Sequence, residues 1–131
     1  MTNEIRTGIS FSIKRRRVLI YRSSLRALEM PSNIRFLLNM KKKKVAVQAC
    51  EAIDRDSFKV PEIIDGGKGQ YEISSVSFIK MVYKLAGWDN DGTYRIAGVV
   101  YPENRLVEFE LEDAVKIADE EFVDPEVDGK E

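Results

Sequence analysis

The chain has 131 residues, of which 44% are hydrophobic. These residues are enough to form a packed core, so wholesale disorder is excluded. It has no histidine and one cysteine, Cys50, which excludes an internal disulfide, a structural zinc site and the usual histidine-activated nucleophiles. The net charge of −1 conceals a split, because residues 1–50 carry +10 and residues 51–131 carry −11. This asymmetry predicts either a polyanion-binding face with a separate acidic surface, or two halves that neutralise each other across an interface.

The sequence predicts neither a transmembrane helix nor a signal peptide. There is no run of eighteen apolar residues, and the polar segment from Met1 to Phe11 does not resemble a signal peptide. We therefore expect a cytoplasmic protein with no membrane partner.

The first half predicts two hairpins joined by a short helix. Ile9, Phe11 and Ile13 alternate with polar residues, as in a half-buried strand, and a second strand follows over 18–21. A short helix is expected over 24–30, capped by Ser23 or Ser24 and ended by Pro31. Alternation then predicts strands over 34–38 and 45–49. The basic runs at 14–17 and 41–44 fall at the two hairpin turns.

The second half predicts one long helix followed by a hairpin. Apolar residues recur at helical spacing from Val76 to Ala86, after Ser75 as a cap and before Gly87 as a stop. Strands are expected over 93–101 and 106–111, with a turn near 102–105. The glycine-rich segment 65–69 lacks the spacing of a phosphate loop, so a plain turn is the favoured interpretation.

The order of elements repeats along the chain. Two serines, a helix, a strand, a turn and a strand occur over 23–50 and again over 74–112, by internal duplication or by chance. We expect a β-rich α+β fold of two small hairpin-containing halves with one long and one short helix. The expected organisation is a basic β-hairpin half at 1–58, an acidic helix-and-hairpin half at 59–117 and an acidic flexible tail at 118–131.

Twelve apolar side chains are expected in the core. They are Phe11, Ile20, Leu28, Phe36, Val47, Phe78, Ile79, Val82, Leu85, Ile96, Val107 and Phe109.

The candidate binding residues are all basic and all lie in the first half. If both hairpin tips project from one side, they form a cationic ridge that matches a phosphate backbone. The alternative is that the lysine run keeps a hairpin turn soluble and protects a strand edge. The candidates are Arg15, Arg16, Arg17, Arg22, Arg26, Arg35, Lys41, Lys42, Lys43 and Lys44.

A family resemblance follows from the strand Arg17-Val18-Leu19-Ile20, the short helix and the strands 34–38 and 44–47. Over about residues 9–49 the chain resembles the AbrB-like swapped-hairpin DNA-binding family. The resemblance implies that two copies interleave into a dimer and that arginines near the first loop meet DNA, here Arg15, Arg16 and Arg17, with Arg22 and Arg26 as lesser candidates. Relatives with two such units in one chain would match the repeat. The acidic second unit is not suited to bind DNA in the same way.

These observations favour a small nucleic-acid-binding or transcription-regulating protein whose basic N-terminal face contacts DNA. The acidic half would mediate association or restrain DNA binding. The alternative is a non-enzymatic interaction or assembly module whose oppositely charged faces bind other protein chains, and head-to-tail charge matching would then produce a homo-oligomer. An enzyme is the least favoured interpretation, because no acid–base or nucleophile constellation is visible, and no cofactor is expected.

Overall fold

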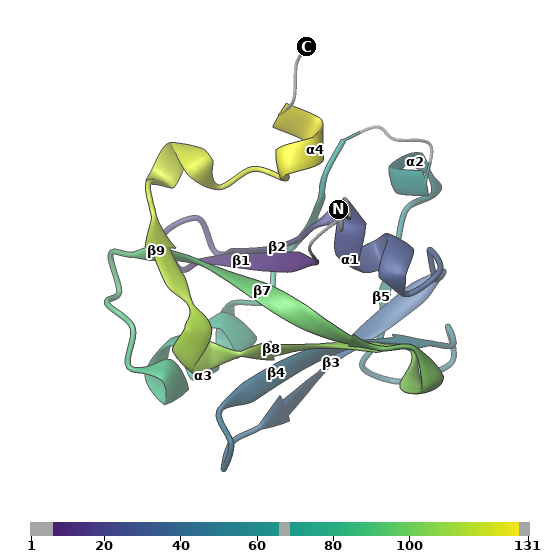
Figure 1. Cartoon of the computed structure of the whole chain (residues 1–131), viewed down its shortest axis with the longest axis horizontal. Coiled ribbons are helices and arrows are strands. Elements are labelled where there is room, and N and C mark those ends of the chain that lie inside the picture. Colours follow the sequence, from purple (N-terminus) through teal and green to yellow (C-terminus); the bar gives the residue numbers. More distant parts are fainter. Residues whose placement is uncertain (1–6, 66–68, 129–131) are drawn as a thin grey trace, which may run out of the picture.

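The computed structural model of the chain describes residues 7–65 and 69–128, and it confirms a β-rich α+β fold. Nine strands in this part of the chain form one antiparallel sheet that curls strongly (Figure 1). No helix in the same ranges is long and apolar enough to cross a lipid bilayer.

The elements alternate along the chain between short strands and helices. The strands are β1 (Gly8–Ser12), β2 (Arg17–Ile20), β3 (Asn33–Asn39), β4 (Lys44–Cys50), β5 (Phe58–Lys59), β6 (Tyr71–Ile73), β7 (Thr93–Tyr101), β8 (Leu106–Glu110) and β9 (Val115–Ile117). The α-helices are α1 (Arg22–Ala27), α2 (Glu62–Asp65), α3 (Val76–Ala86) and α4 (Pro125–Asp128). Three short 3-10 turns are η1 (Pro102–Asn104), η2 (Leu111–Asp113) and η3 (Asp119–Glu121).

The sheet is a nearly closed ring in the order β5-β3-β4-β8-β7-β1-β2-β6. The long strand β7 links its two parts, because 93–97 pairs with β1 and 98–101 pairs with β8. The short strand β9 pairs with the start of β7, outside this order. Strands β5 and β6 stand at the two open ends. The Tyr71 hydroxyl donates to the Lys59 carbonyl at 2.8 Å across that gap.

The pairing pattern has a two-fold topology. Two units of strand, strand, helix, strand, strand follow each other, namely β1-β2-α1-β3-β4 and β5-β6-α3-β7-β8. Exchanging the units maps β1–β7 onto β5–β3 and β3–β4 onto β7–β8, while the β2–β6 and β4–β8 pairs map onto themselves. The β1–β2 and β7–β9 ladders have no counterpart. The repeated element order is therefore confirmed, and the first strand of each unit pairs with the other unit.

The three predicted hairpin turns are confirmed, at 13–16, 40–43 and 102–105. Arg16, Lys43 and Arg105 adopt left-handed φ values of 59°, 56° and 49° in these turns. An L-residue in this region costs about 1 kcal/mol, which the flanking ladders must offset.

The long helix follows the predicted pattern, whereas the short helix does not follow its predicted boundaries. Helix α3 has Ser75 at its N-cap position, and Gly87 ends it in the left-handed conformation at φ 72°. The prediction that Ser23 or Ser24 caps α1 is wrong, because Tyr21 holds that position. Ser24 is instead an internal residue of α1. Its hydroxyl accepts the Gly8 backbone N–H and donates to the Gly8 carbonyl, both at 2.8 Å.

The core is shared by both halves of the chain. Nine of the twelve predicted core residues are buried, and Phe36, Phe78 and Leu85 pack partly buried against them. The Phe36 and Phe78 rings stack with centroids 4.5 Å apart, joining β3 of the first unit to α3 of the second. A single apolar interior therefore holds the two units together.

The prediction of an acidic flexible tail is wrong for residues 118–128. Phe122 is 2% exposed and packs against Leu19 and Tyr21. The buried Asp124 carboxylate accepts the Arg22 backbone N–H at 2.6 Å, and the Asp124 N–H donates to the Gln70 side chain at 3.0 Å. Residues 129–131 of the predicted tail lie outside the described part of the chain, as do residues 66–68 of the glycine-rich turn.

Candidate binding surfaces

The ten predicted basic residues do not form one ridge. Figure 1 shows the β1–β2 turn beside β9 and the β3–β4 turn at the bottom of the view, at separate corners of the molecule. Arg15, Arg16 and Arg17 lie at the first turn, and Lys41 to Lys44 lie at the second. The three remaining arginines lie on α1 and β3, away from both tips.

The first tip is held against the C-terminal segment. Lys14 forms an ion pair with Asp119 at 2.8 Å, and Arg15 donates to the Asp119 carbonyl at 3.1 Å. The Arg15 guanidinium also lies over the Phe122 ring, 5.5 Å from its centroid. Hydrogen bonds from Lys14 and Thr93 lower the pKa of Asp119. Of the three predicted arginines, only Arg16 is exposed with no partner for its side chain in the described structure.

The next three arginines act mainly within the fold. Arg22 is 7% exposed and donates to the Gly69 carbonyl at 2.7 Å. Arg26 forms an ion pair with Glu126, and Arg35 donates through Nε and Nη2 to the Gln48 side chain at 3.0 and 2.9 Å. Their positive charges are therefore turned toward neighbouring groups of the same chain.

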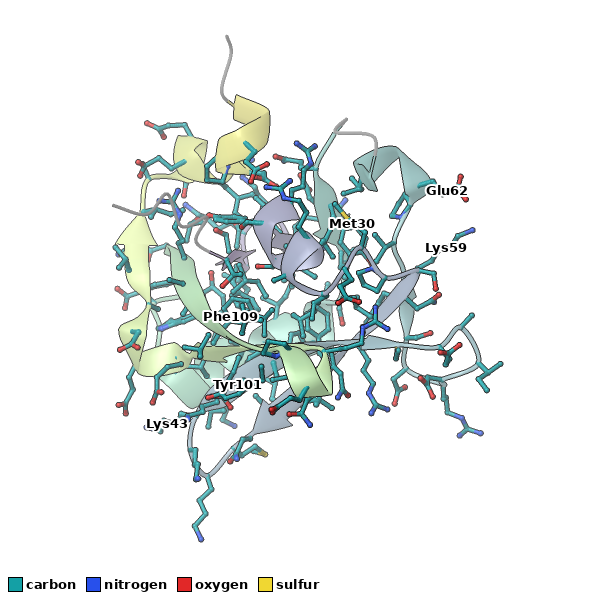
Figure 2. All side chains as sticks on the ribbon, turned by 45° about the vertical axis from the view of Figure 1, so that its right-hand side comes forward. Met30, Lys43, Lys59, Glu62, Tyr101 and Phe109 are labelled. Atoms are coloured by element: carbon teal, nitrogen blue, oxygen red, sulfur yellow. The ribbon has the colours of Figure 1, made fainter. Side chains whose placement is uncertain are left out.

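The second tip is the freer of the two. Lys41, Lys42 and Lys43 are exposed and have no acidic partner among the described residues. Figure 2 shows Lys43 extending away from the body of the molecule. Lys44 is different, because it pairs with Glu108 at 3.3 Å and Glu110 at 3.9 Å, and the Glu108 hydrogen bond raises its pKa.

Charge neutralisation between the halves is the dominant electrostatic pattern. Five of the six ion pairs in the described structure join a cation of residues 1–50 to a carboxylate of residues 51–131. Exposed ion pairs are screened by water and salt, so their main effect is on surface charge. This pattern matches the interpretation in which the two halves neutralise each other.

A second surface lies on the outer face of β3, β4, β8 and β7. The cross-strand register aligns Leu37, Ala46, Glu108 and Val99 in one row. The next row contains Arg35, Gln48, Leu106 and Tyr101. We call these two rows, together with Met40, the outer face.

Apolar side chains on the outer face are unusually accessible. Leu37, Val99 and Tyr101 are 38%, 57% and 41% exposed, and Met40 at the adjoining turn is 61% exposed. A hollow of about 530 Å³ lies between Leu37, Ala46 and Leu106. Clustered apolar side chains in a polar surround are typical of interaction sites.

The outer face has a cationic end and an acidic end. The β3–β4 turn places Lys41 to Lys43 at one end. At the other end, the Ala49 N–H donates to the Arg105 carbonyl, which holds the end of β4 beside the β7–β8 turn. The loop after β4 and the β7–β8 turn carry the carboxylates of Glu51, Asp54, Asp56 and Glu103, which outnumber the exposed cations Arg55 and Arg105 in the same segments. Sequence reasoning missed this face because Leu37, Val99 and Tyr101 come from strands far apart in the chain. The sequence carried one signal of this face, namely an apolar residue on each of these four strands at a position where the polar-apolar alternation predicts a solvent-facing side chain.

Two features of the described residues concern metal and thiol chemistry. No cluster of three or more His, Cys, Asp or Glu side chains suited to a metal ion occurs among them. Burial and the nearby Asp54 raise the pKa of the Cys50 thiol, which disfavours the reactive thiolate. Comparison with known proteins finds no matching family model and no significant match to a curated protein or a solved structure.

Proposed function

We propose that the protein is an interaction module that associates with a second copy of itself through the outer face. The observation that carries the proposal is the exposed apolar centre of this face between ends of opposite charge. Two copies related by a two-fold axis that lies in the plane of the interface, perpendicular to the strands, would meet face to face in antiparallel orientation. Lys41 to Lys43 of each copy would then face Glu51, Asp56 and Glu103 of the other, so the charge contact forms twice.

The centre of the face supports the same arrangement. Val99, Leu37 and Tyr101 would be removed from water on both copies at once. The central Glu108 carboxylate already has Lys44 as a partner within the same chain, which reduces repulsion between the two copies of Glu108. Four strands of about seven residues span roughly 400 Å². An area of this size predicts a weak, reversible association rather than an obligate dimer.

The test is sedimentation equilibrium over a wide range of protein concentration. The wild-type chain is expected to approach twice its 15.0 kDa mass, and Val99→Lys is expected to remain monomeric because it places a charge at the apolar centre. Val115→Lys is the matched control, since Val115 is similarly exposed, at 61%, but lies on β9 outside the face. Dimerisation that survives Val99→Lys, or an absence of dimerisation in the wild type, would contradict the proposal.

A second candidate function is DNA binding through the β3–β4 turn. The specific observation in its favour is that Lys41, Lys42 and Lys43, and Arg16 at the other tip, have no acidic partner in the described structure. The resemblance of about residues 9–49 to the AbrB-like family implies the same candidate.

An electrophoretic titration against mixed DNA separates the two candidates. If the lysine turn binds DNA, replacing Lys41, Lys42 and Lys43 by Gln should weaken binding to all sequences and flatten the salt dependence, at about 0.9 per lost phosphate contact. Arg16→Gln should remove a smaller part of the affinity. Val99→Lys leaves the lysine turn intact and serves as the control. An absence of DNA retention at low salt would eliminate this candidate and leave the self-association proposal untouched.

A further inference from the structure

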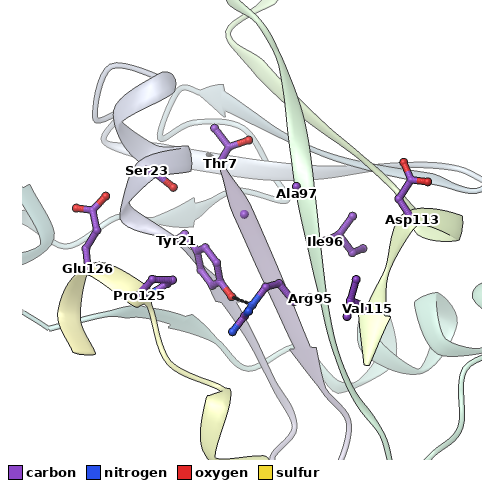
Figure 3. A pocket seen from close by; sticks show the side chains of 11 residues that line it. Thr7, Tyr21, Ser23, Arg95, Ile96, Ala97, Asp113, Val115, Pro125 and Glu126 are labelled. Carbon is purple, nitrogen blue, oxygen red and sulfur yellow. Dashed lines mark hydrogen bonds between the residues drawn. The ribbon is translucent and has the colours of Figure 1, made fainter. Parts of the chain in front are cut away.

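A second hollow, of about 600 Å³, lies away from the outer face described above. Figure 3 shows it between the start of α1, the strands β1 and β7, the η2–β9 segment and the C-terminal helix α4. Its apolar lining comes from Ile96, Ala97, Val115 and Pro125. Volumes of about 300–1,000 Å³ with mostly apolar walls and a few polar groups are typical of small-molecule sites.

Arg95 is the cation of this hollow. Its Nε donates to the Tyr21 hydroxyl at 2.7 Å, and that hydroxyl also lies 2.7 Å from the Ser10 hydroxyl. The Arg95 Nη2 donates to the Glu121 carbonyl at 3.3 Å. Both partners are neutral, so Arg95 forms no ion pair within the described structure. The guanidinium is therefore fixed in position while its charge lacks a counter-ion.

A buried polar group without a hydrogen-bond partner lies beside the hollow. Thr7 is 7% exposed and lines the hollow, and its hydroxyl has no hydrogen-bond partner in the described structure. Its oxygen is shielded from solvent and would lie 2.9 Å from a Cβ atom on Gly98, beside the core residues Phe109 and Val107, so a ligand in the hollow does not reach it.

Two small residues on neighbouring strands line the hollow. Gly8 pairs with Ala97 across β1 and β7, and both line it. A Cβ atom on Gly8 would lie 2.3 Å from the Tyr21 ring, so only glycine lets that ring lie flat over the strand.

We propose that this hollow binds a small monocarboxylate with an apolar body. The carboxylate is placed at the Arg95 guanidinium, where its charge supplies the missing counter-ion. The apolar body is placed over Ala97, Val115 and Pro125. The carboxylates of Asp113 and Glu126 also line the hollow, and Glu126 already pairs with Arg26. These two groups disfavour a second negative charge on the ligand, so the site selects monoanions over dianions.

The probe is hexanoate, followed by ¹H–¹⁵N NMR titration of the full chain. Hexanoate is expected to shift the amide signals of Gly8, Ile96 and Ala97 in a saturable manner. Hexylammonium and adipate test the charge requirement with the same number of carbons, and each is expected to bind at least about tenfold more weakly. Equal shifts from hexanoate and hexylammonium would show that Arg95 does not select the ligand, and would overturn the proposal.

Two variants locate the site. Ala97→Trp fills the hollow from an exposed strand position and is expected to abolish the hexanoate shifts while preserving the spectrum of the fold. Arg95→Gln is expected to weaken hexanoate about tenfold or more and to strengthen hexylammonium, because the repulsive guanidinium charge is removed. Arg16→Gln, an exposed arginine at the β1–β2 tip, is the matched control. Saturable hexanoate binding that persists in Ala97→Trp would place the site elsewhere and refute the assignment, as would an absence of shifts in the wild type.

Discussion

At the scale of single residues, Tyr83 shows how a buried polar group ties elements together. Its hydroxyl accepts the Ile13 N–H at 3.1 Å and lies within bonding distance of the Gly92 and Phe11 carbonyls, at 2.6 and 3.1 Å. One side chain of α3 thereby joins the end of β1 to the start of β7. Tyr83→Phe leaves these groups unpaired and is expected to lower the free energy of unfolding by about 1–3 kcal/mol at neutral pH.

The same residue predicts an alkaline effect. Burial raises the pKa of Tyr83 from 10.0 to about 12. The folded form thus keeps a proton that the unfolded chain loses, so the contribution of Tyr83 to stability is complete below pH 10 and declines from there toward pH 12. Denaturation midpoints of wild type and Tyr83→Phe should therefore converge across that window. A constant difference between the two proteins from neutral pH to pH 12 would contradict this assignment.

Residue periodicity predicted the apolar core well but not the polar contacts inside it. Ile79 and Val82 could be assigned because helical spacing states which face of α3 is buried. The hydrogen bonds of Tyr83 and Ser24 could not, because their partners come from strands whose positions depend on the whole fold. For the same reason the basic residues could be named as a group, but their pairing with the acidic half could not be predicted.

At the scale of elements, the C-terminal segment is part of the fold. Phe122, the Asp124 carboxylate and the Lys14–Asp119 pair hold it against β2, α1 and the β1–β2 turn. Deleting residues 119–131 removes all three contacts, and truncating a well-buried phenylalanine alone costs about 3–5 kcal/mol. The deletion is therefore expected to lower the thermal midpoint strongly. Phe122→Ala should account for a large part of the loss, with the exposed Glu120→Ala as its control. An unchanged midpoint in the truncated chain would show that the segment contributes nothing to stability.

The error about this segment has a physical source. Composition counted few apolar groups after Ala118, which is typical of an unpacked tail. One phenylalanine suffices here because Phe122 packs against the apolar side chains of Leu19 and Tyr21. In addition, the Asp124 carboxylate accepts the Arg22 backbone N–H, and the Asp124 N–H donates to the Gln70 side chain. These contact residues belong to segments distant in the sequence, so the local sequence could not reveal them.

At the scale of the whole molecule, the charge split of the sequence has two outcomes. Part of it is neutralised inside the chain by ion pairs between the halves, as for Lys44 and Glu108. The rest is separated along one sheet face, with Lys41 to Lys43 at one end and Glu51, Asp56 and Glu103 at the other. Composition predicted the split, but only the interleaving of the two units decides which charges pair and which remain on the surface.

Charge-reversal complementation tests the proposed association most directly. The first variant carries Lys41→Glu, Lys42→Glu and Lys43→Glu. The second variant carries Glu51→Lys, Asp56→Lys and Glu103→Lys. Each variant alone places like charges together at both ends of an antiparallel dimer, so each is expected to sediment as a monomer of about 15.0 kDa. An equimolar mixture restores opposite charges at both ends and is expected to form heterodimers at low salt that dissociate at high salt. Monomeric behaviour of the mixture, under conditions where the wild-type chain dimerises, would contradict the proposed arrangement.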